Sequence, residues 1–149
     1  MKAEFPFIEG LSTEISAGLP MVYAAVASMD TKVPIALVSD GVSKFLSMLL
    51  GVEAFSGGLV LVDEIENGFY YDRLPKVWAA LLLACKHSGT QVFASTHSAE
   101  CLRGLLPTLR DHADEFSLIR AEKVDGRCTA RMFTGRELRS AIEQDMEIR

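Results

Sequence analysis

The sequence has no hydrophobic run of the roughly 18–20 residues that a membrane-spanning helix needs. Its start, Met1 to Pro6, does not have the layout of a secretory signal peptide. We therefore expect a cytoplasmic protein without a membrane segment. Cysteine is also scarce. Cys85, Cys101 and Cys128 are odd in number and lack metal-type spacing. Two of them fall on apolar helical faces, where we expect cysteine to pack as a small hydrophobic side chain.

Positive charge is in short supply. The chain carries 15 Lys and Arg against 20 Asp and Glu, a net charge of −5, and so lacks the basic excess of a stand-alone nucleic-acid binder. Any contact with nucleic acid would come from other segments or chains. With 149 residues, 49% of them hydrophobic, the chain is expected to form a single domain over 1–149.

Hydrophobic spacing predicts alternating strands and helices. Residues 1–20 read as a short strand followed by a loop, and the later strands are expected at 21–28, 34–38, 59–62 and 91–95. Amphipathic helices are expected from Val42 onward, from Leu74 onward and after the cap Ser98. The expected helix caps are Ser39 or Asp40, Asp72, Gly89 and Ser98. This succession predicts an α/β fold with a mainly parallel sheet between helical layers.

The C-terminal part predicts a β-hairpin followed by a helix. Asp125-Gly126, flanked by the expected strands Phe116–Val124 and Arg127–Phe133, is a two-residue hairpin signal. Thr134 and Glu137 have the spacing of a capping box, which predicts a helix start there.

Two adjacent carboxylates follow the aliphatic strand Leu59–Val62, whose composition is typical of a strand covered on both faces. Ligands of parallel α/β sheets bind at the carboxyl ends of strands, so Asp63 and Glu64 have the chemistry of a Walker B element. Asp63 would hold Mg²⁺ through its water shell. Glu64 would act as a general base or position the attacking water. The alternative is that two acids merely end a strand at the solvent boundary.

The next strand ends in Ser95-Thr96-His97-Ser98. If the two strands are neighbours, the imidazole of His97 reaches the same crevice as Glu64 and could hydrogen-bond a γ-phosphate or the attacking water. A third element, the turn Ser39-Asp40-Gly41-Val42, opens a helix with free amides and could bind an anion. Taken by itself, this turn is better interpreted as an ordinary helix cap.

Together these elements closely resemble the C-terminal half of ABC-type ATPases, in the SMC/RecF-like branch that includes the OLD (overcoming lysogenization defect) family and related AAA-labelled ATP-binding proteins. Ser39–Val42 matches the signature turn, and Leu59–Glu64 with Ile65-Glu66-Asn67-Gly68 matches Walker B and the D-loop. Ser95–Ser98 matches the switch histidine segment. The resemblance runs from about Gly18 to the final Glu147-Ile148-Arg149.

The resemblance implies a specific site. Two heads would pair head to tail, and each ATP would lie between the P-loop of one head and the signature turn of the other. Glu64 would then be the catalytic glutamate, Asp63 the Mg²⁺ aspartate and His97 the switch histidine. Ser39 and Gly41 would contact nucleotide in trans. The dimer seam would be lined by Glu66, Asn67 and Gly68.

One motif of such ATPases is missing. The sequence contains no Gly-x-x-x-x-Gly-Lys-[Ser/Thr], and none of its 11 glycines is followed by lysine. Without a P-loop most nucleotide affinity should be lacking. Asp40 also stands where transporter-type members have glycine. We therefore expect ATP and Mg²⁺ to bind only in a site completed by a P-loop-bearing N-terminal half or a second ATPase head.

Two other functions remain open at this point. The chain could be a non-catalytic ABC-like module that pairs with a complete ATPase head. It could instead be a metal-dependent nuclease with Asp63, Glu64, Glu66 and His97 as ligands, although the sequence lacks the second glutamate and Asp-x-Asp cluster of a Toprim nuclease domain.

Overall fold

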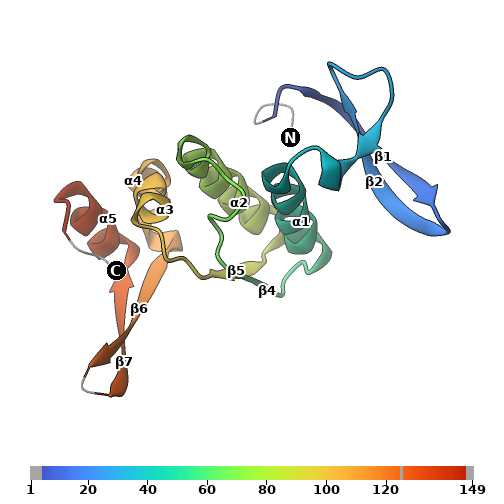
Figure 1. Ribbon diagram of the computed structural model, residues 1–149. Coiled ribbons are helices and arrows are strands. Elements are labelled where there is room, and N and C mark those ends of the chain that lie inside the picture. The colour runs from blue at the N-terminus through green and yellow to red at the C-terminus, as the bar shows by residue number, and fades with distance from the viewer. Residues whose placement is uncertain (1–4, 125, 147–149) are drawn as a thin grey trace.

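The computed structural model describes residues 5–124 and 126–146 and confirms the α/β class. Its strands are β1 (Ile8–Ser16), β2 (Leu19–Val26), β3 (Val33–Pro34), β4 (Leu59–Val62), β5 (Gln91–Ala94), β6 (Ser117–Val124) and β7 (Arg127–Thr134). Its α-helices are α1 (Asp40–Ala54), α2 (Leu74–Ser88), α3 (Ala99–Gly104), α4 (Leu106–His112) and α5 (Gly135–Glu143), with short 3₁₀ turns at Ile35–Leu37, Tyr71–Arg73 and Ala113–Glu115. Figure 1 shows an extended body with a β-hairpin at each end.

The N-terminal sheet is antiparallel, in the order β1-β2-β3. The prediction of a loop before residue 20 is wrong. Strand β1 continues to Ser16 and a tight turn at Ala17-Gly18 leads into β2. Gly18 has a φ of 80°, a conformation that glycine adopts without steric cost, so the turn can close within two residues. One face of the sheet packs against α1 through a cluster of five buried residues: Ile8, Ala24, Val26, Ile35 and Val42.

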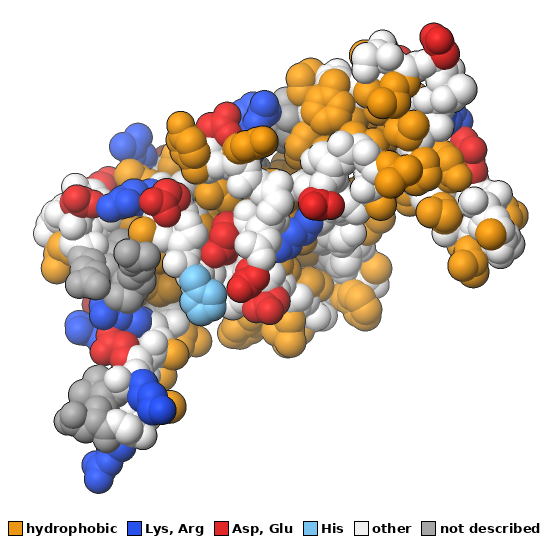
Figure 2. Space-filling view, in the orientation of Figure 1, with side chains coloured by type: hydrophobic (Ala, Val, Ile, Leu, Met, Phe, Trp, Pro, Cys, Tyr) orange, Lys and Arg blue, Asp and Glu red, His pale blue; other side chains and the backbone are white. Residues whose placement is uncertain are grey.

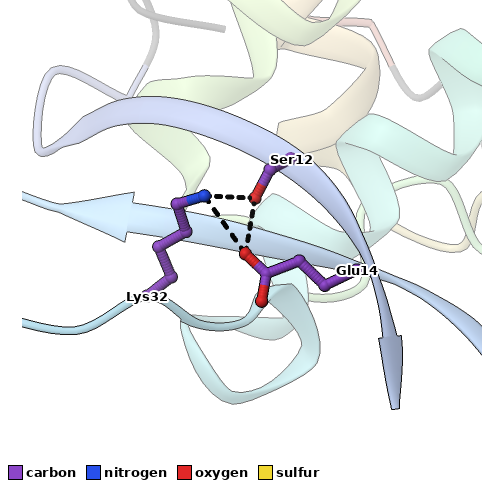
Figure 3. Close-up of polar contacts among 3 residues, drawn as sticks. All are labelled: Ser12, Glu14 and Lys32. Carbon is purple, nitrogen blue, oxygen red and sulfur yellow. Dashed lines mark hydrogen bonds and ion pairs between the residues drawn. The ribbon is translucent and has the colours of Figure 1, made fainter.

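The same sheet carries a small polar cluster. The Lys32 ammonium donates hydrogen bonds to Ser12 Oγ (2.9 Å) and to Glu14 Oε1 (3.1 Å), as Figure 3 shows. Hydrogen bonds from Lys32 and Ser12 hold the pKa of the Glu14 carboxyl below its ordinary value. The Lys32 and Glu14 side chains are 49% and 42% exposed, so their ion pair contributes little to stability.

Strands β4 and β5 form the predicted parallel pair, with Leu59 opposite Gln91 and Val62 opposite Ala94. Their inner face, with Val60, Val62 and Val92, packs against the main hydrophobic core. That core is built from α1 and α2 with Ile65 and Cys101 and includes Phe45, Met48, Val52, Leu74, Val77 and Leu81. The outer face of this strand pair was also expected to be buried. The described residues do not cover it, because Leu59 and Leu61 are 51% and 73% exposed.

Most predicted helix caps are confirmed. Ser39 Oγ accepts from Val42 N (3.2 Å), Ser98 Oγ accepts from Cys101 N (3.1 Å), and Gly89 ends α2 with a φ of 69°. The prediction for Asp72 is wrong. This residue lies inside a 3₁₀ turn, and Arg73 precedes α2 without a side-chain cap.

The helix expected after Ser98 is divided into α3 and α4 at Leu105. Pro107 lies in the first turn of α4, and its missing N–H cannot continue the hydrogen bonding of α3. Leu105 and Leu109 pack with Leu138 and Ile142 of α5 in a third core cluster.

At the C-terminus β6 and β7 pair as an antiparallel hairpin from Ser117–Thr134 to Val124–Arg127. Gly126 of the predicted turn has a φ of 76°, whereas Asp125 lies outside the described residues, as do Glu147 to Arg149. The Thr134–Glu137 capping box is confirmed.

Two further outcomes concern cysteine and membrane segments. The two cysteines on helical faces are buried (Cys101) and half-buried (Cys85), whereas Cys128 is exposed on β7. Among the described residues no helix is long and apolar enough to cross a membrane.

Candidate functional site

The carboxyl ends of β4 and β5 bring the predicted site residues together. Because Val62 and Ala94 are paired at the end of the ladder, Asp63-Glu64 and Ser95-Thr96-His97 leave the sheet side by side. This is the edge at which parallel α/β sheets bind their ligands. Figure 2 shows acidic side chains and a histidine gathered at the centre of the visible face, over the ends of these two strands.

Ser95 fastens the acidic turn to the neighbouring strand. Its hydroxyl donates to Asp63 Oδ1 (2.5 Å) and accepts from Glu64 N (2.8 Å). Its carbonyl accepts from Ile65 N (3.0 Å). One serine therefore fixes both the carboxylate of Asp63 and the backbone of Glu64. No sequence motif marks this serine as a functional residue, because its partners lie about 30 residues away along the chain.

The backbone of Glu64 has an unusual conformation, with a φ of 46°. Such a left-handed conformation is unfavourable for a residue with a side chain and persists only where neighbours hold it. Lys44 of α1 donates to the carbonyl oxygens of Glu64 (2.5 Å) and Asp63 (3.3 Å). The amide of Asn67 donates to Glu64 Oε2. Hydrogen bonds therefore hold the turn at its backbone carbonyl groups and also hold the exposed carboxylate of Glu64.

The side chain of Glu66 points toward the segment that contains His97. Its Oε1 accepts from His97 N (3.0 Å), and its Oε2 is buried without a hydrogen-bond partner among the described residues. Burial alone would raise the pKa of this carboxyl. Hydrogen bonds from the Glu66 and His97 backbone and from the Thr96 hydroxyl nevertheless hold the pKa below its ordinary value.

The predicted signature turn lies directly against the predicted D-loop. A Cβ atom added to Gly41 would be 2.3 Å from the carbonyl oxygen of Gly68, so only glycine fits at this contact. Gly68 has a φ of 86°. Gly41 is buried, whereas Ser39 is exposed and uses its hydroxyl to cap α1. The structure thus joins 39–42 and 63–68 into one continuous surface.

The acidic residues do not assemble into a multidentate metal centre. Within the described parts of the chain no group of three or more His, Cys, Asp and Glu side chains could hold a metal ion. The ligand set Asp63, Glu64, Glu66 and His97 of the nuclease alternative is therefore wrong. Glu66 is hydrogen-bonded to the backbone of His97 and is not turned toward the other carboxylates as a ligand. A single exposed carboxylate such as Asp63 still fits Mg²⁺, which keeps several of its waters in protein sites.

Comparison with known proteins places this geometry in a family. A family model described as "AAA domain, putative AbiEii toxin, Type IV TA system" matches residues 14–103, which include every predicted site residue. The chain belongs to this AAA-domain family.

A curated relative is the protein named "ATP/GTP phosphatase" from Helicobacter pylori. It is 28% identical over 125 residues, which cover 80% of this chain and 34% of the relative. The chain thus spans about a third of the length of that relative.

A solved structure shares the fold. It comes from work on ATP-driven dimerization and DNA-stimulated activation of SMC ATPases, and the match has a TM-score of 0.59 at 15% identity. The match covers 99% of this chain and 89% of that chain, so the two are of similar length. The AAA-domain chain therefore has a P-loop NTPase-like fold of the kind found in an SMC ATPase.

Proposed function

We propose that this chain supplies the Walker B acids, the switch histidine and the signature turn of an ABC-type, OLD-like ATP-hydrolysing site. A P-loop from another segment or chain would complete the site. The carrying observation is the pairing of β4 with β5, which brings Asp63, Glu64 and His97 to one sheet edge. The hydrogen bonds of Ser95 to Asp63 and Glu64 also support the proposal. Two acids that merely end a strand in solvent would not need a turn that is fixed in this way.

Each residue has a role that follows from its surroundings. Bound Mg²⁺-ATP would supply the phosphoryl group, with the ion neutralising charge on the phosphate oxygens. Asp63 offers an exposed hard oxygen donor held by Ser95, which suits the water shell of Mg²⁺. Glu64 is held through Lys44 and Asn67 and can orient an attacking water or accept its proton. His97 is exposed beside it and can hydrogen-bond the same water or a phosphate oxygen.

The arrangement in trans is part of the proposal. Ser39 and Gly41 would contact a nucleotide held by a second head, in a head-to-tail pair; exposed Ser39 fits this contact, whereas Gly41, buried against Gly68, fits it less well. Exposed Asn67 and Gly68, which lie beside this turn, fit the seam of such a pair. Half-buried Glu66 fits that seam less well, because one of its oxygens is committed to His97. The solved relative supports pairing by analogy, since its study describes ATP-driven dimerization of SMC ATPases.

The alternative is a non-catalytic module that pairs with a complete ATPase head. The absence of a P-loop motif from the sequence and the exposed outer face of β4 and β5 favour this alternative. Fixed Asp63 and Glu64 favour a hydrolytic role, because a pairing module has no need of an oriented acidic pair.

Titration with Mg²⁺-ATP tests the proposal. The chain would be produced alone and together with the protein segment encoded on the 5′ side of the Met1 codon. We expect binding only in the completed assembly, and we expect Asp63→Asn to weaken the dependence of binding on Mg²⁺. An assembly that contains a P-loop yet binds no nucleotide would favour the pairing module.

A further inference from the structure

A lysine of α1 binds the backbone of the acidic turn. Helix α1 packs against β4 (Figure 1), and Lys44 lies in its second turn, so this half-buried side chain reaches the residues that follow the strand. The Lys44 ammonium donates to the carbonyl oxygens of Glu64 (2.5 Å) and Asp63 (3.3 Å). Its hydrogen bonds therefore go to the main chain that carries the two acids.

The carbonyl groups of two successive residues converge on this ammonium. In an extended strand, successive carbonyl groups point in opposite directions. Glu64 departs from the extended form, with a φ of 46°, and both its carbonyl oxygen and that of Asp63 lie within hydrogen-bonding distance of Lys44 Nζ. Carbonyl dipoles whose oxygen ends converge repel each other, and a cation between the two oxygens relieves that repulsion. The charge of Lys44 thus stabilises the left-handed conformation of Glu64.

The carbonyl group of Glu64 accepts a further hydrogen bond. Asn67 N donates to it at 2.9 Å, and the side-chain amide of Asn67 donates to the Glu64 carboxylate. Lys44 and Asn67 together hold the peptide group that follows Glu64. Because the side chain of Glu64 leaves the backbone next to this peptide group, a change in its backbone dihedrals would redirect the carboxylate.

Helix α1 contacts the acidic turn at its beginning and at its end. Lys44 binds the carbonyl groups of Asp63 and Glu64, and Gly41, about one helical turn earlier, lies against the backbone of Gly68. The contact at Gly41 is close packing. The contact at Lys44 is a charge-assisted hydrogen bond, which is attractive and directional. Lys44 is therefore the group of α1 that fixes the catalytic end of the turn.

We propose that Lys44 is a positioning residue for the attacking water, acting through Glu64. The inference rests on the proposed function, in which Glu64 orients this water or accepts its proton. Lys44 holds the backbone of Glu64 in its left-handed conformation and thereby sets where the carboxylate stands. Loss of Lys44 should slow hydrolysis and leave nucleotide binding unchanged.

A direct contact between Lys44 and the nucleotide is the competing role. An ammonium group has three N–H donors, and the two carbonyl oxygens use two of them. If the third donated to a phosphate oxygen, loss of Lys44 would weaken nucleotide binding. It would also slow hydrolysis whether or not the Glu64 carboxylate is present. The two roles therefore predict different results in a double variant.

Hydrogen exchange on the chain alone tests the contact with the backbone. Lys44→Met keeps the length of the side chain and a high helix propensity but removes the charge. We expect the Asn67 amide, which donates to the Glu64 carbonyl, to exchange about fivefold faster in this variant than in the parent. Exchange of the Asn67 amide at the parent rate would overturn the inference.

Two further variants serve as controls. Lys44→Arg keeps a cation at the same place and should restore most of the protection of the Asn67 amide. Lys123→Met removes an exposed lysine of β6 and should leave this amide unchanged. A Lys44→Arg variant that exchanges as fast as Lys44→Met would show that the cation does not hold the turn, and would also overturn the inference.

Single-turnover phosphate release from Mg²⁺-ATP, measured on the assembly completed with a P-loop, tests the effect on hydrolysis. We expect Lys44→Met to slow release about 10–100-fold, the loss that misplacement of a reacting group by about 1 Å can cause. The affinity for Mg²⁺-ATP should stay at its parent value, and Lys44→Arg should recover most of the rate. A weakened affinity in Lys44→Met would favour direct contact with the nucleotide and overturn the inference.

A double variant shows whether Lys44 acts through Glu64. If it does, Lys44→Met slows release in the parent but adds little to Glu64→Gln, because no carboxylate then remains to be positioned. The same fold-loss in both backgrounds would mean that Lys44 acts independently of Glu64, which contradicts the positioning role.

These variants also separate the inference from the proposed function. Phosphate release from Glu64→Gln at the parent rate would contradict the proposed function. Slow release from Glu64→Gln, together with release from Lys44→Met at the parent rate, would contradict only the positioning role of Lys44 and leave the function standing.

Discussion

The backbone amide of His97 donates a hydrogen bond to Glu66 Oε1 at 3.0 Å. The two residues belong to different strand-end turns, one following β4 and the other following β5. Glu66 is thus a positioning residue that ties the turn bearing the proposed catalytic glutamate to the segment bearing the proposed switch histidine.

Removal of the Glu66 carboxylate should loosen the His97 segment. In Glu66→Ala the His97 amide loses its acceptor, worth about 1 kcal/mol for a half-buried bond, and should exchange about fivefold faster with solvent. Glu66→Gln keeps an oxygen at the same place and serves as the control. Hydrogen exchange measured by NMR on the chain alone checks this, and equal exchange in the alanine variant and the parent would contradict the tie.

Ser95 should matter for both neighbouring acids. Ser95→Ala leaves Asp63 without its hydroxyl donor and Glu64 N without its acceptor, so the chain should lose about 1–2 kcal/mol in the free energy of unfolding. Ser95→Thr keeps the hydroxyl and should lose less. Urea unfolding followed by circular dichroism measures both. A threonine variant as unstable as the alanine variant would show that the hydroxyl is not what holds the turn.

Gly41 should tolerate no side chain. In Gly41→Ala the new Cβ would overlap the carbonyl oxygen of Gly68, a backbone atom that cannot rotate away, so a cost of about 1–3 kcal/mol is expected. Gly10→Ala is the matched control, because a Cβ there meets nothing within 4 Å. Thermal unfolding of both variants measures this difference in stability. A Gly41→Ala variant as stable as Gly10→Ala would mean that the two turns do not touch.

Stability should fall in acid partly through the capping box of α5. Hydrogen bonds from the backbone and side chain of Thr134 hold the pKa of the Glu137 carboxyl below its ordinary value in the folded chain. The folded state therefore binds this proton less readily than the unfolded state does. The contribution is present above the unfolded pKa and is lost as the pH falls through the lower, folded pKa.

Glu137→Gln removes this titration. We expect the urea midpoint to fall less between pH 7 and pH 3 in the variant than in the parent. Asp114, whose pKa is lowered by its bond to Arg136, and Glu14 contribute in the same direction, so part of the pH dependence should persist. An unchanged pH dependence would contradict the role assigned to the capping box.

The sequence predicted the location of the acids and the histidine, but not what holds them. Two aliphatic runs that end in polar residues place Asp63 and His97 at one edge by the geometry of parallel strands alone. Lys44 and Ser95 contact the acidic turn from about 20 and 30 residues away along the chain. Such contacts depend on side-chain directions that no local pattern encodes.

The outer face of β4 was mispredicted for a related reason. Four consecutive aliphatic residues predict a strand covered on both sides, whether the cover comes from the same chain or from another. Here α1 and α2 cover one side, and Leu61 remains exposed on the other. The hydrophobic pattern therefore indicates that both faces of the strand are suited to burial. Only the fold shows which of the two faces this chain itself covers.

The central claim is that Glu64 drives hydrolysis in a site completed by a P-loop. Single-turnover phosphate release from Mg²⁺-ATP, measured on the completed assembly, tests it most directly, with Glu53→Gln on the exposed side of α1 as the matched control. We predict that Glu64→Gln binds Mg²⁺-ATP as the parent does but releases phosphate about 10²–10⁴-fold more slowly, the usual contribution of general base catalysis. Phosphate release from Glu64→Gln at the rate of the parent and the control would contradict the account.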